Sequence, residues 1–188
     1  MSRATDPANK SPANKPLAHA VEVAAEQLQQ YLTFMLSGEV FAMGILAIKE
    51  IIEYANLTKV PMMPEYVRGV INLRGSVVPV IDLSIRFGKE SSSVTKRTCI
   101  VIIEIEASGE RHVLGVVVDA VNAVLDIPAS EIEPPPAFGA RIRTDFIQGM
   151  GKVNGKFVIL LDVNHTLAVD EMQALAETAQ DAAHVAAA

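Results

Sequence analysis

Three aspartates are the residues in this chain best placed for chemistry, because each directly follows a short apolar run typical of a strand. Asp82 follows Val-Ile, Asp119 follows Val-Val and Asp162 follows Leu-Leu. Carboxylates at the ends of strands could together bind a metal ion. Aspartate in this position also commonly accepts hydrogen bonds from nearby backbone N–H groups. We favour the second interpretation, because neither a glycine-rich calcium loop nor a histidine partner accompanies these aspartates.

Other catalytic patterns are absent from the sequence. The four histidines are dispersed, and the serines form neither a nucleophile elbow nor a Ser-x-x-Lys pair. The segment Gly-Met-Gly-Lys at 149–152 has too few residues between its glycines for a phosphate loop, and Val153 follows its lysine. The sequence therefore predicts no catalytic centre, no metal site and no cofactor. Binding is the remaining class of function.

Polar residues embedded in an apolar hairpin are the best indication of binding. Residues 69–83, GVINLRGSVVPVIDL, join two β-type runs at a Gly-Ser pair. With Gly75-Ser76 as the loop, glycine at the first central position suits a type II′ turn. Arg74 then faces Val77 across the strands, and Asn72 shares that face. The opposite face carries an apolar set that can form core: Ile71, Leu73, Val78 and Val80.

Arg74 is the residue of this hairpin with the clearest chemistry. Its guanidinium has a fixed charge and five donors, so beside a turn it can bind a carboxylate or carbonyl of a partner. An internal salt bridge with Asp82 or Glu50 is the alternative. Asn72 could likewise satisfy a local backbone group, and Glu50 could be an ordinary solvated strand residue. The sequence leaves these alternatives open.

The elements that must position these residues are mostly strands. Between residues 30 and 164, apolar runs are broken by Gly, Asn, Asp or Pro at roughly ten-residue intervals, a pattern typical of a small barrel or sandwich. Hairpins are predicted across Ser37-Gly38, Ser108-Gly109 and Asn154-Gly155. Periodicity alone does not decide whether residues 45–54 form a helix or a turn followed by a strand.

Charge and composition exclude several partners. The net charge is −6, and the segment 167–188 carries four acidic residues with no Lys or Arg. A basic stripe for phosphate is lacking, so neither nucleic acid nor an anionic membrane is an expected partner. Apolar runs are too short for a membrane helix, so we expect a cytoplasmic protein without membrane insertion. Cys99 is the only cysteine, which excludes an intramolecular disulfide.

Several motifs in one order carry a family resemblance. The hairpin sequence is preceded by FAMGILAIKEIIEY and VPMMPEYVRG, and it is followed by GVVVDAVNAVLDIPASEIEPPP and FIQGMGKVNGKFVILLDVNHTL. Together these motifs, over residues 29–167, resemble the chemotaxis coupling proteins of the CheW family. The resemblance implies a mainly β fold of two intertwined five-stranded SH3-like barrels with a core between them, short helices and a C-terminal helix. A short helical turn near Leu46, followed by a strand through Glu50, is also implied.

Three segments follow from the resemblance and the composition. Residues 1–28 are expected to be a disordered or partly helical extension, and residues 168–188 an Ala-rich helical or frayed tail. The region 29–167 is the family domain, divided near residue 95, with strands that can cross between its two barrels.

The resemblance also implies a function. Such proteins are non-catalytic scaffolds that couple the cytoplasmic signalling tips of chemoreceptors to the regulatory domain of the histidine kinase CheA. The protein is then recruited to receptor arrays at the inner face of the membrane, with other copies of itself as further candidate partners. The alternative is a regulatory or ligand-sensing barrel domain of another two-component pathway.

Candidate contact residues follow from the resemblance, and Phe138 is added to them because of its surroundings in the sequence. Those implied for the receptor lie on the hairpin and the preceding strand: Ile48, Glu50, Asn72, Arg74 and Gly75. For the kinase or for rings of copies the resemblance implies Val116 and Val118, and Phe138 is a further candidate. Phe138 stands between three prolines and a glycine, where it is hard to bury.

Overall fold

The computed structural model describes residues 28–135 and 146–167, and most of these residues lie in strands. The predictions for the N-terminal extension, the C-terminal tail and Phe138 lie outside these residues. The strands are β1 (Leu28–Leu36), β2 (Glu39–Gly44), β3 (Ile48–Glu53), β4 (Val67–Leu73), β5 (Ser76–Asp82), β6 (Cys99–Ala107), β7 (Glu110–Val118), β8 (Ala120–Pro128), β9 (Ile132–Glu133), β10 (Ile147–Val153) and β11 (Lys156–Leu161). The short helices are η1 (Ile45–Ala47), α1 (Leu83–Arg86), η2 (Ala129–Glu131) and α2 (Val163–Thr166).

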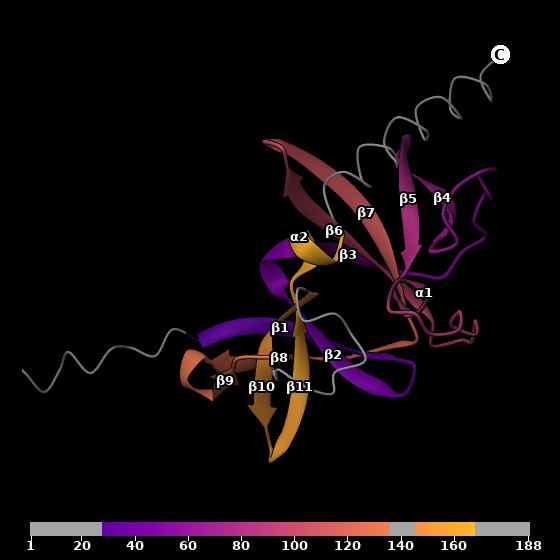
Figure 1. The fold of residues 1–188 in the computed structure, drawn as a ribbon. Coiled ribbons are helices and arrows are strands. Elements are labelled where there is room, and N and C mark those ends of the chain that lie inside the picture. Colours follow the sequence, from indigo (N-terminus) through magenta and orange to yellow (C-terminus); the bar gives the residue numbers. More distant parts are fainter. Residues whose placement is uncertain (1–27, 136–145, 168–188) are drawn as a thin grey trace, which may run out of the picture.

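The strands form two sheets, seen as the lower and upper parts of Figure 1. The lower sheet has six strands in the order β8-β1-β2-β11-β10-β9, and the upper has five in the order β3-β6-β7-β5-β4. The mainly β fold with two intertwined units is thus confirmed. The lower sheet has one strand more than the expected five, because the two-residue β9 pairs with β10 as an additional edge strand.

The two halves of the sequence repeat one plan. Each begins with a nine-residue strand, β1 or β6, followed by a Ser-Gly turn and a second strand. Each ends with a hairpin whose first strand has seven residues, β4–β5 or β10–β11. An aspartate and a four-residue helix then follow: Asp82 with α1 in the first half, Asp162 with α2 in the second.

Each sheet combines strands from both halves. The chain leaves the six-stranded sheet through η1, enters the other sheet as β3, and returns at Asp119 as β8. The second strand of each half pairs in parallel with the last strand of the other, β2 with β11 and β7 with β5. The predicted division near residue 95 therefore separates the halves of the sequence and not the two sheets, because β3 and β8 cross over.

Four tight turns define the hairpins, and all have glycine in second place. They are Ser37-Gly38, Arg74-Gly75, Ser108-Gly109 and Asn154-Gly155, each with positive φ at both residues, as a type I′ turn requires. The predicted Gly75-Ser76 loop is wrong by one residue, because Leu73 pairs with Ser76. The pairing register consequently moves by two residues, which leaves every side chain on its predicted face.

Three hydrophobic clusters stabilise this arrangement. The largest lies between the sheets, and each of the other two lies within one sheet. The predicted core of the β4–β5 hairpin is confirmed, since Ile71, Val78 and Val80 are buried and Leu73 packs against them. The six-stranded sheet is rolled: a methyl group added at Gly151 of β10 would lie 3.1 Å from Ile127 of β8, although three other strands separate β10 from β8 in the sheet order.

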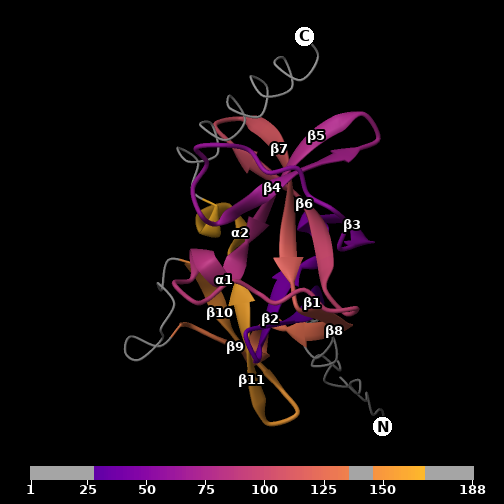
Figure 2. The same ribbon diagram turned by 90° about the vertical axis from the view of Figure 1, so that its right-hand side faces the viewer.

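The helices of the described part are short. None of them is both long enough and apolar enough to cross a membrane. Figure 2 shows α1 and α2 close to the junction of the two sheets, where each follows the last strand of its half.

Candidate functional site

The three aspartates all accept backbone hydrogen bonds, as the favoured interpretation predicts. Asp82 Oδ1 accepts from Ser84 N at 2.9 Å, and Asp162 Oδ1 accepts from His165 N at 3.1 Å. Asp119 Oδ2 accepts from Ser37 N at 2.7 Å, at the point where the chain crosses between sheets. Two of these carboxylates cap short helices, and the third joins a crossover to a turn. Within 28–135 and 146–167, His, Cys, Asp and Glu side chains form no group of three that could hold a metal ion.

Asp82 is the most deeply placed of the three. Its side chain is fully buried, and Oδ2 accepts from Arg68 Nε at 2.9 Å and from Ser91 Oγ at 3.0 Å. The backbone N–H of Ser92 donates to the same oxygen at 3.3 Å. The charge of Asp82 is thus compensated by an arginine, and the carboxylate holds the loop after α1 against the hairpin. This role is structural.

Arg74 forms an ion pair with Glu50, so the internal pairing left open by the sequence is present. The contact is bidentate, with Nη1–Oε1 2.8 Å and Nη2–Oε2 3.0 Å. Glu50 lies on β3 and Arg74 follows β4, the two edge strands of the five-stranded sheet, so the pair closes the rolled sheet. The Arg74 side chain is still 77% exposed, and a partner could reach its remaining donors. Asn72 Oδ1 accepts from Gly75 N at 2.8 Å and stabilises the turn.

Ile48 does not share a face with Glu50, contrary to the grouping made from the sequence. Ile48 pairs with Ile103 of the core between the sheets, whereas Glu50 pairs with Ile102 of the core inside the five-stranded sheet. Directly paired residues of antiparallel strands lie on the same face. The cause is a bulge at Lys49, which turns the strand over between the two residues.

Val116 and Val118 cannot serve as direct contacts for a kinase or for another copy. Their side chains are 1% and 0% exposed and belong to the core between the sheets. Strand β7 lies in the middle of its sheet, between β6 and β5, and cores cover both of its faces from Leu114 to Val118. A partner would have to open the core to reach them.

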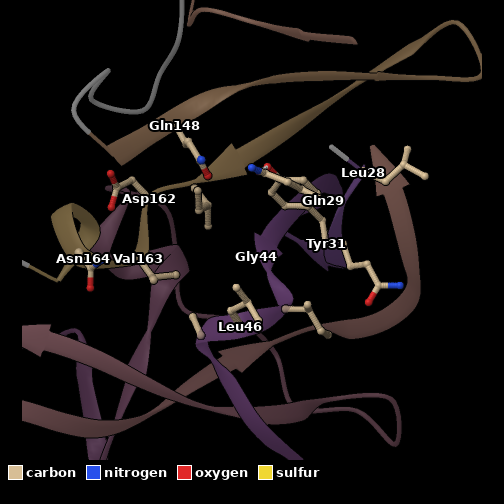
Figure 3. A pocket seen from close by; sticks show the side chains of 13 residues that line it. Leu28, Gln29, Tyr31, Gly44, Leu46, Gln148, Asp162, Val163 and Asn164 are labelled. Carbon is tan, nitrogen blue, oxygen red and sulfur yellow. Dashed lines mark hydrogen bonds between the residues drawn. The ribbon is translucent and has the colours of Figure 1, made fainter. Parts of the chain in front are cut away.

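An open cleft lies at the junction of the two sheets, where β1 begins and the chain crosses over. It has a volume of about 550 Å³ and is lined by residues 28–31, 44–47 and 161–164 together with Gln148. Leu46 is 99% exposed and Leu28 is 62% exposed, unusual values for leucine in contact with a cleft. Figure 3 shows Leu46 on one side of the cleft and Gln148 with Asp162 on the other.

Polar groups form part of the cleft wall. Asp162 Oδ2 contacts His165 Nδ1 at 2.7 Å, and the Tyr31 hydroxyl donates to Gln29 Oε1 at 2.7 Å. Burial raises the pKa of Tyr31, so its hydroxyl remains a protonated donor at neutral pH. Apolar walls with a polar edge suit the side of an amphipathic helix, which combines an apolar stripe with polar flanks.

Sequence reasoning missed the cleft and Leu46. The sequence did contain one indication of an exposed apolar residue, the apolar segment from Ile45 onward. Whether this segment forms a helix or a strand, its apolar residues point to more than one side. Such a segment must leave one side exposed. Which side this is depends on η1 and the bulge at Lys49, and neither has a local sequence signature.

Comparison with known proteins agrees with this geometry. The family model for the CheW-like domain matches residues 30–171, which include all but the first two residues of the sheets and most of the cleft lining. The chain belongs to the CheW-like family. Chemotaxis protein CheW of Klebsiella aerogenes is 34% identical over 157 residues, which are 83% of this chain and 92% of that protein. CheW of Bacillus subtilis is also 34% identical, over 77% of this chain and 90% of its own length.

A solved structure has the same fold. The scaffolding protein TtCheW from Thermoanaerobacter tengcongensis is 33% identical, with a TM-score of 0.68, and the match covers 80% of this chain and 94% of that one. Protein FrzA of Myxococcus xanthus is a more distant relative, at 26% identity over 84% of this chain. The CheW-like domain of this chain therefore has relatives named as chemotaxis proteins and as a scaffold.

Proposed function

We propose that this chain is a non-catalytic scaffold of bacterial chemotaxis that couples the signalling tips of chemoreceptors to the regulatory domain of the histidine kinase CheA. The observation that carries this proposal is the open cleft at the sheet junction, with fully exposed Leu46, in a chain that belongs to the CheW-like family. The absence of a recognisable catalytic pattern in the sequence agrees with a binding role.

The receptor tip binds as a helix lying in the cleft. Leu46 and Leu28 contact its apolar stripe, and the polar side chains of the cleft contact its flanks. Strand β3 begins directly after the cleft, and Glu50 follows Ala47 by three residues, about 10 Å along an extended chain. Glu50 and Arg74 thus extend the binding surface with a polar contact that sets the register of the helix.

The other residues proposed for the receptor act through the turn. Asn72 and Gly75 fix the β4–β5 turn that presents Arg74, and Ile48 anchors the start of β3 in the core. These three are positioning residues.

The kinase binds a surface apart from the cleft, so one molecule can hold both partners. This surface consists of exposed side chains, since Val116 and Val118 are in the core. In the cell, the scaffold is cytoplasmic and concentrated at receptor arrays, where further copies of it can join.

Binding of a purified receptor signalling fragment tests the proposal. We expect Leu46→Glu to weaken binding at least tenfold, because it places a charge in the desolvated centre of the contact. Arg74→Glu should weaken binding less. The matched control is Phe157→Glu, which adds the same charge at an exposed residue near the β10–β11 turn. Equal receptor affinities for Leu46→Glu and Phe157→Glu would refute the cleft assignment.

The kinase measurement completes the test. Leu46→Glu and Arg74→Glu should both bind the isolated CheA regulatory domain as tightly as the unchanged chain does, because a different surface is proposed. Loss of kinase binding in both variants, with their thermal unfolding unchanged, would contradict the two-surface arrangement.

A further inference from the structure

The end of the first-half hairpin corresponds to the hairpin end that lines the cleft. In the first half, a segment of the chain itself covers this place. The two final hairpins have first strands of equal length and turns at the same place, so three cleft residues have matching positions in the first half: Gln148 matches Arg68, Asp162 matches Asp82, and Asn164 matches Ser84. All three matching residues contact the segment that precedes β6.

Ser91 and Ser92 make those contacts. Ser91 Oγ donates to Asp82, Arg68 Nη2 donates to the Ser92 carbonyl, and the Ser84 and Ser92 hydroxyls are 2.9 Å apart. Ser92 is 8% exposed as a result. The segment before the first strand of the second half therefore covers that hairpin end and its helix cap.

In the second half the matching position is the open cleft. The segment that precedes β1 is residues 1–27, and it joins the described chain at Leu28 on the cleft wall. When the Ser37-Gly38 and Ser108-Gly109 turns are aligned, residues at equal distances before them correspond. Leu28 then corresponds to Cys99, and Val21 corresponds to Ser92. By this correspondence, the residues around Val21 are the ones placed to cover Asp162.

The sequence of this segment fits an apolar cleft. Leu17, Val21 and Ala24 recur at a spacing that would place them on one face of a helix. The acidic residues Glu22 and Glu26 fall on the opposite face, as does His19. The family match begins at residue 30, so this segment belongs to the chain outside the shared domain.

We propose that residues 17–27 bind in the cleft of their own chain, with Leu17 and Val21 as apolar contacts, and compete there with the partner helix. The binding of the segment stands on the internal correspondence, whereas the competition rests on the proposed function. The direct connection at Leu28 gives the segment a high effective concentration at the cleft. The affinity of the scaffold for its receptor is then lowered in proportion to the occupied fraction.

A spin label tests where the segment lies in the full chain. With Cys99→Ser to remove the natural thiol, Glu22→Cys carries a nitroxide on the polar face, and amide signals are recorded by NMR. We expect broadening of Leu46 and Asn164, and its loss when Leu17→Glu and Val21→Glu are added. The matched control, His19→Glu with Gln27→Glu, adds two acidic groups off the apolar face and should keep the broadening.

Three results would overturn the proposal. The first is no broadening at the cleft, or broadening that the Leu17→Glu and Val21→Glu changes leave intact. The second is broadening that appears when isotope-labelled chains without nitroxide are mixed with nitroxide-bearing chains, which assigns the cleft to a second copy. The third is cleft broadening only from a nitroxide at Ala179→Cys, which assigns it to the tail.

Receptor affinity tests the competition separately. We expect Leu17→Glu with Val21→Glu to bind the receptor fragment about two- to tenfold more tightly than the unchanged chain, because the cleft is freed. Unchanged affinity together with lost broadening would refute the competition and the receptor assignment of the cleft, while the segment would still be established as the cleft occupant.

Discussion

The two halves of this chain build the same hairpin end and finish it differently. In the first half, Asp82 is fully buried and bound by Arg68 and by the loop before β6. In the second half, Asp162 is 31% exposed and bound by His165, and a cleft lies beside it. The same fold thus provides a closed end that stabilises and an open end that can bind.

The residues at the matching positions explain this difference. Arg68 brings a positive charge to Asp82 and binds the loop, so the carboxylate can be buried. Gln148 stands at the corresponding position and brings no charge, so Asp162 keeps its contact with solvent. Arginine at this position accompanies a buried structural carboxylate, and glutamine at its counterpart accompanies one that lines a cleft.

Removal of the two carboxylate charges gives the largest expected difference between the halves. Asp82→Asn should destabilise the fold by about 3 kcal/mol, because it leaves Arg68 largely buried without its counter-charge. Asp162→Asn should cost less than about 1 kcal/mol, because asparagine caps helices nearly as well as aspartate. Chemical denaturation of both variants measures the difference. Equal losses of stability would mean that the two ends are not distinct.

The glycines at matching bulges give the next largest difference. Gly69 and Gly149 occupy the same position in β4 and β10, where the pairing register shifts. An added methyl group at Gly69 would lie 2.5 Å from the Thr58 carbonyl oxygen, and φ is +150° there. At Gly149 it would lie 2.7 Å from a methyl group of Ile132 and 2.9 Å from the Glu133 carbonyl oxygen, both in the two-residue edge strand β9.

Alanine substitution should therefore lower the free energy of unfolding more at Gly69 than at Gly149. We expect Gly69→Ala to lower the free energy of unfolding by about 3 kcal/mol, since both the backbone and Thr58 resist the change. Gly149→Ala should cost about 1 kcal/mol, because β9 can shift. Thermal unfolding of both variants gives the ranking, and the reverse order would contradict this account of the bulges.

The smallest expected effect concerns the crossing strands. Both β3 and β8 have a bulge where they meet the first strand of the other half. Where β8 meets β1, the Thr33 hydroxyl donates a hydrogen bond to the Ala123 carbonyl. Where β3 meets β6, Lys49 Nζ donates to Glu104 Oε2 at 2.7 Å. The hydrogen bond and charge of Lys49 lower the pKa of Glu104.

A lowered pKa in the folded state makes this contribution depend on pH. The stabilisation is present above the ordinary pKa of glutamate and is lost as the pH falls through the lowered value. Lys49→Met should therefore reduce stability slightly at neutral pH and not in strong acid. The difference in unfolding midpoint between Lys49→Met and the unchanged chain, followed from pH 7 to pH 3, measures this. A difference that grows in acid would refute the assignment.

Local signals made the hairpins predictable from the sequence, since an X-Gly pair between apolar runs favours a type I′ turn. Arg74-Gly75 was missed because arginine rarely adopts positive φ, and the following serine offered another turn. The buried state of Val116 and Val118 had a signal that went unused. The continuous apolar run from Leu114 is typical of a strand covered on both faces.

Other features depend on distant parts of the chain and have no local signal. The face of Ile48 depends on a bulge against β6, and the Arg74–Glu50 pair depends on the rolling of a whole sheet. The cleft depends on which strands cross between sheets. Fold class was therefore predictable from the sequence, whereas the residues that line the candidate site were not.

The exchange of strands between the halves also governs how this protein can be made. β2 leaves the ribosome early, yet its parallel neighbour β11 is among the last strands to be synthesised. The five-stranded sheet uses only strands β3 to β7, so all of its strands have been made before β8 is synthesised. The six-stranded sheet must wait for β11, so β1 and β2 are held without their parallel partner strand until late in synthesis.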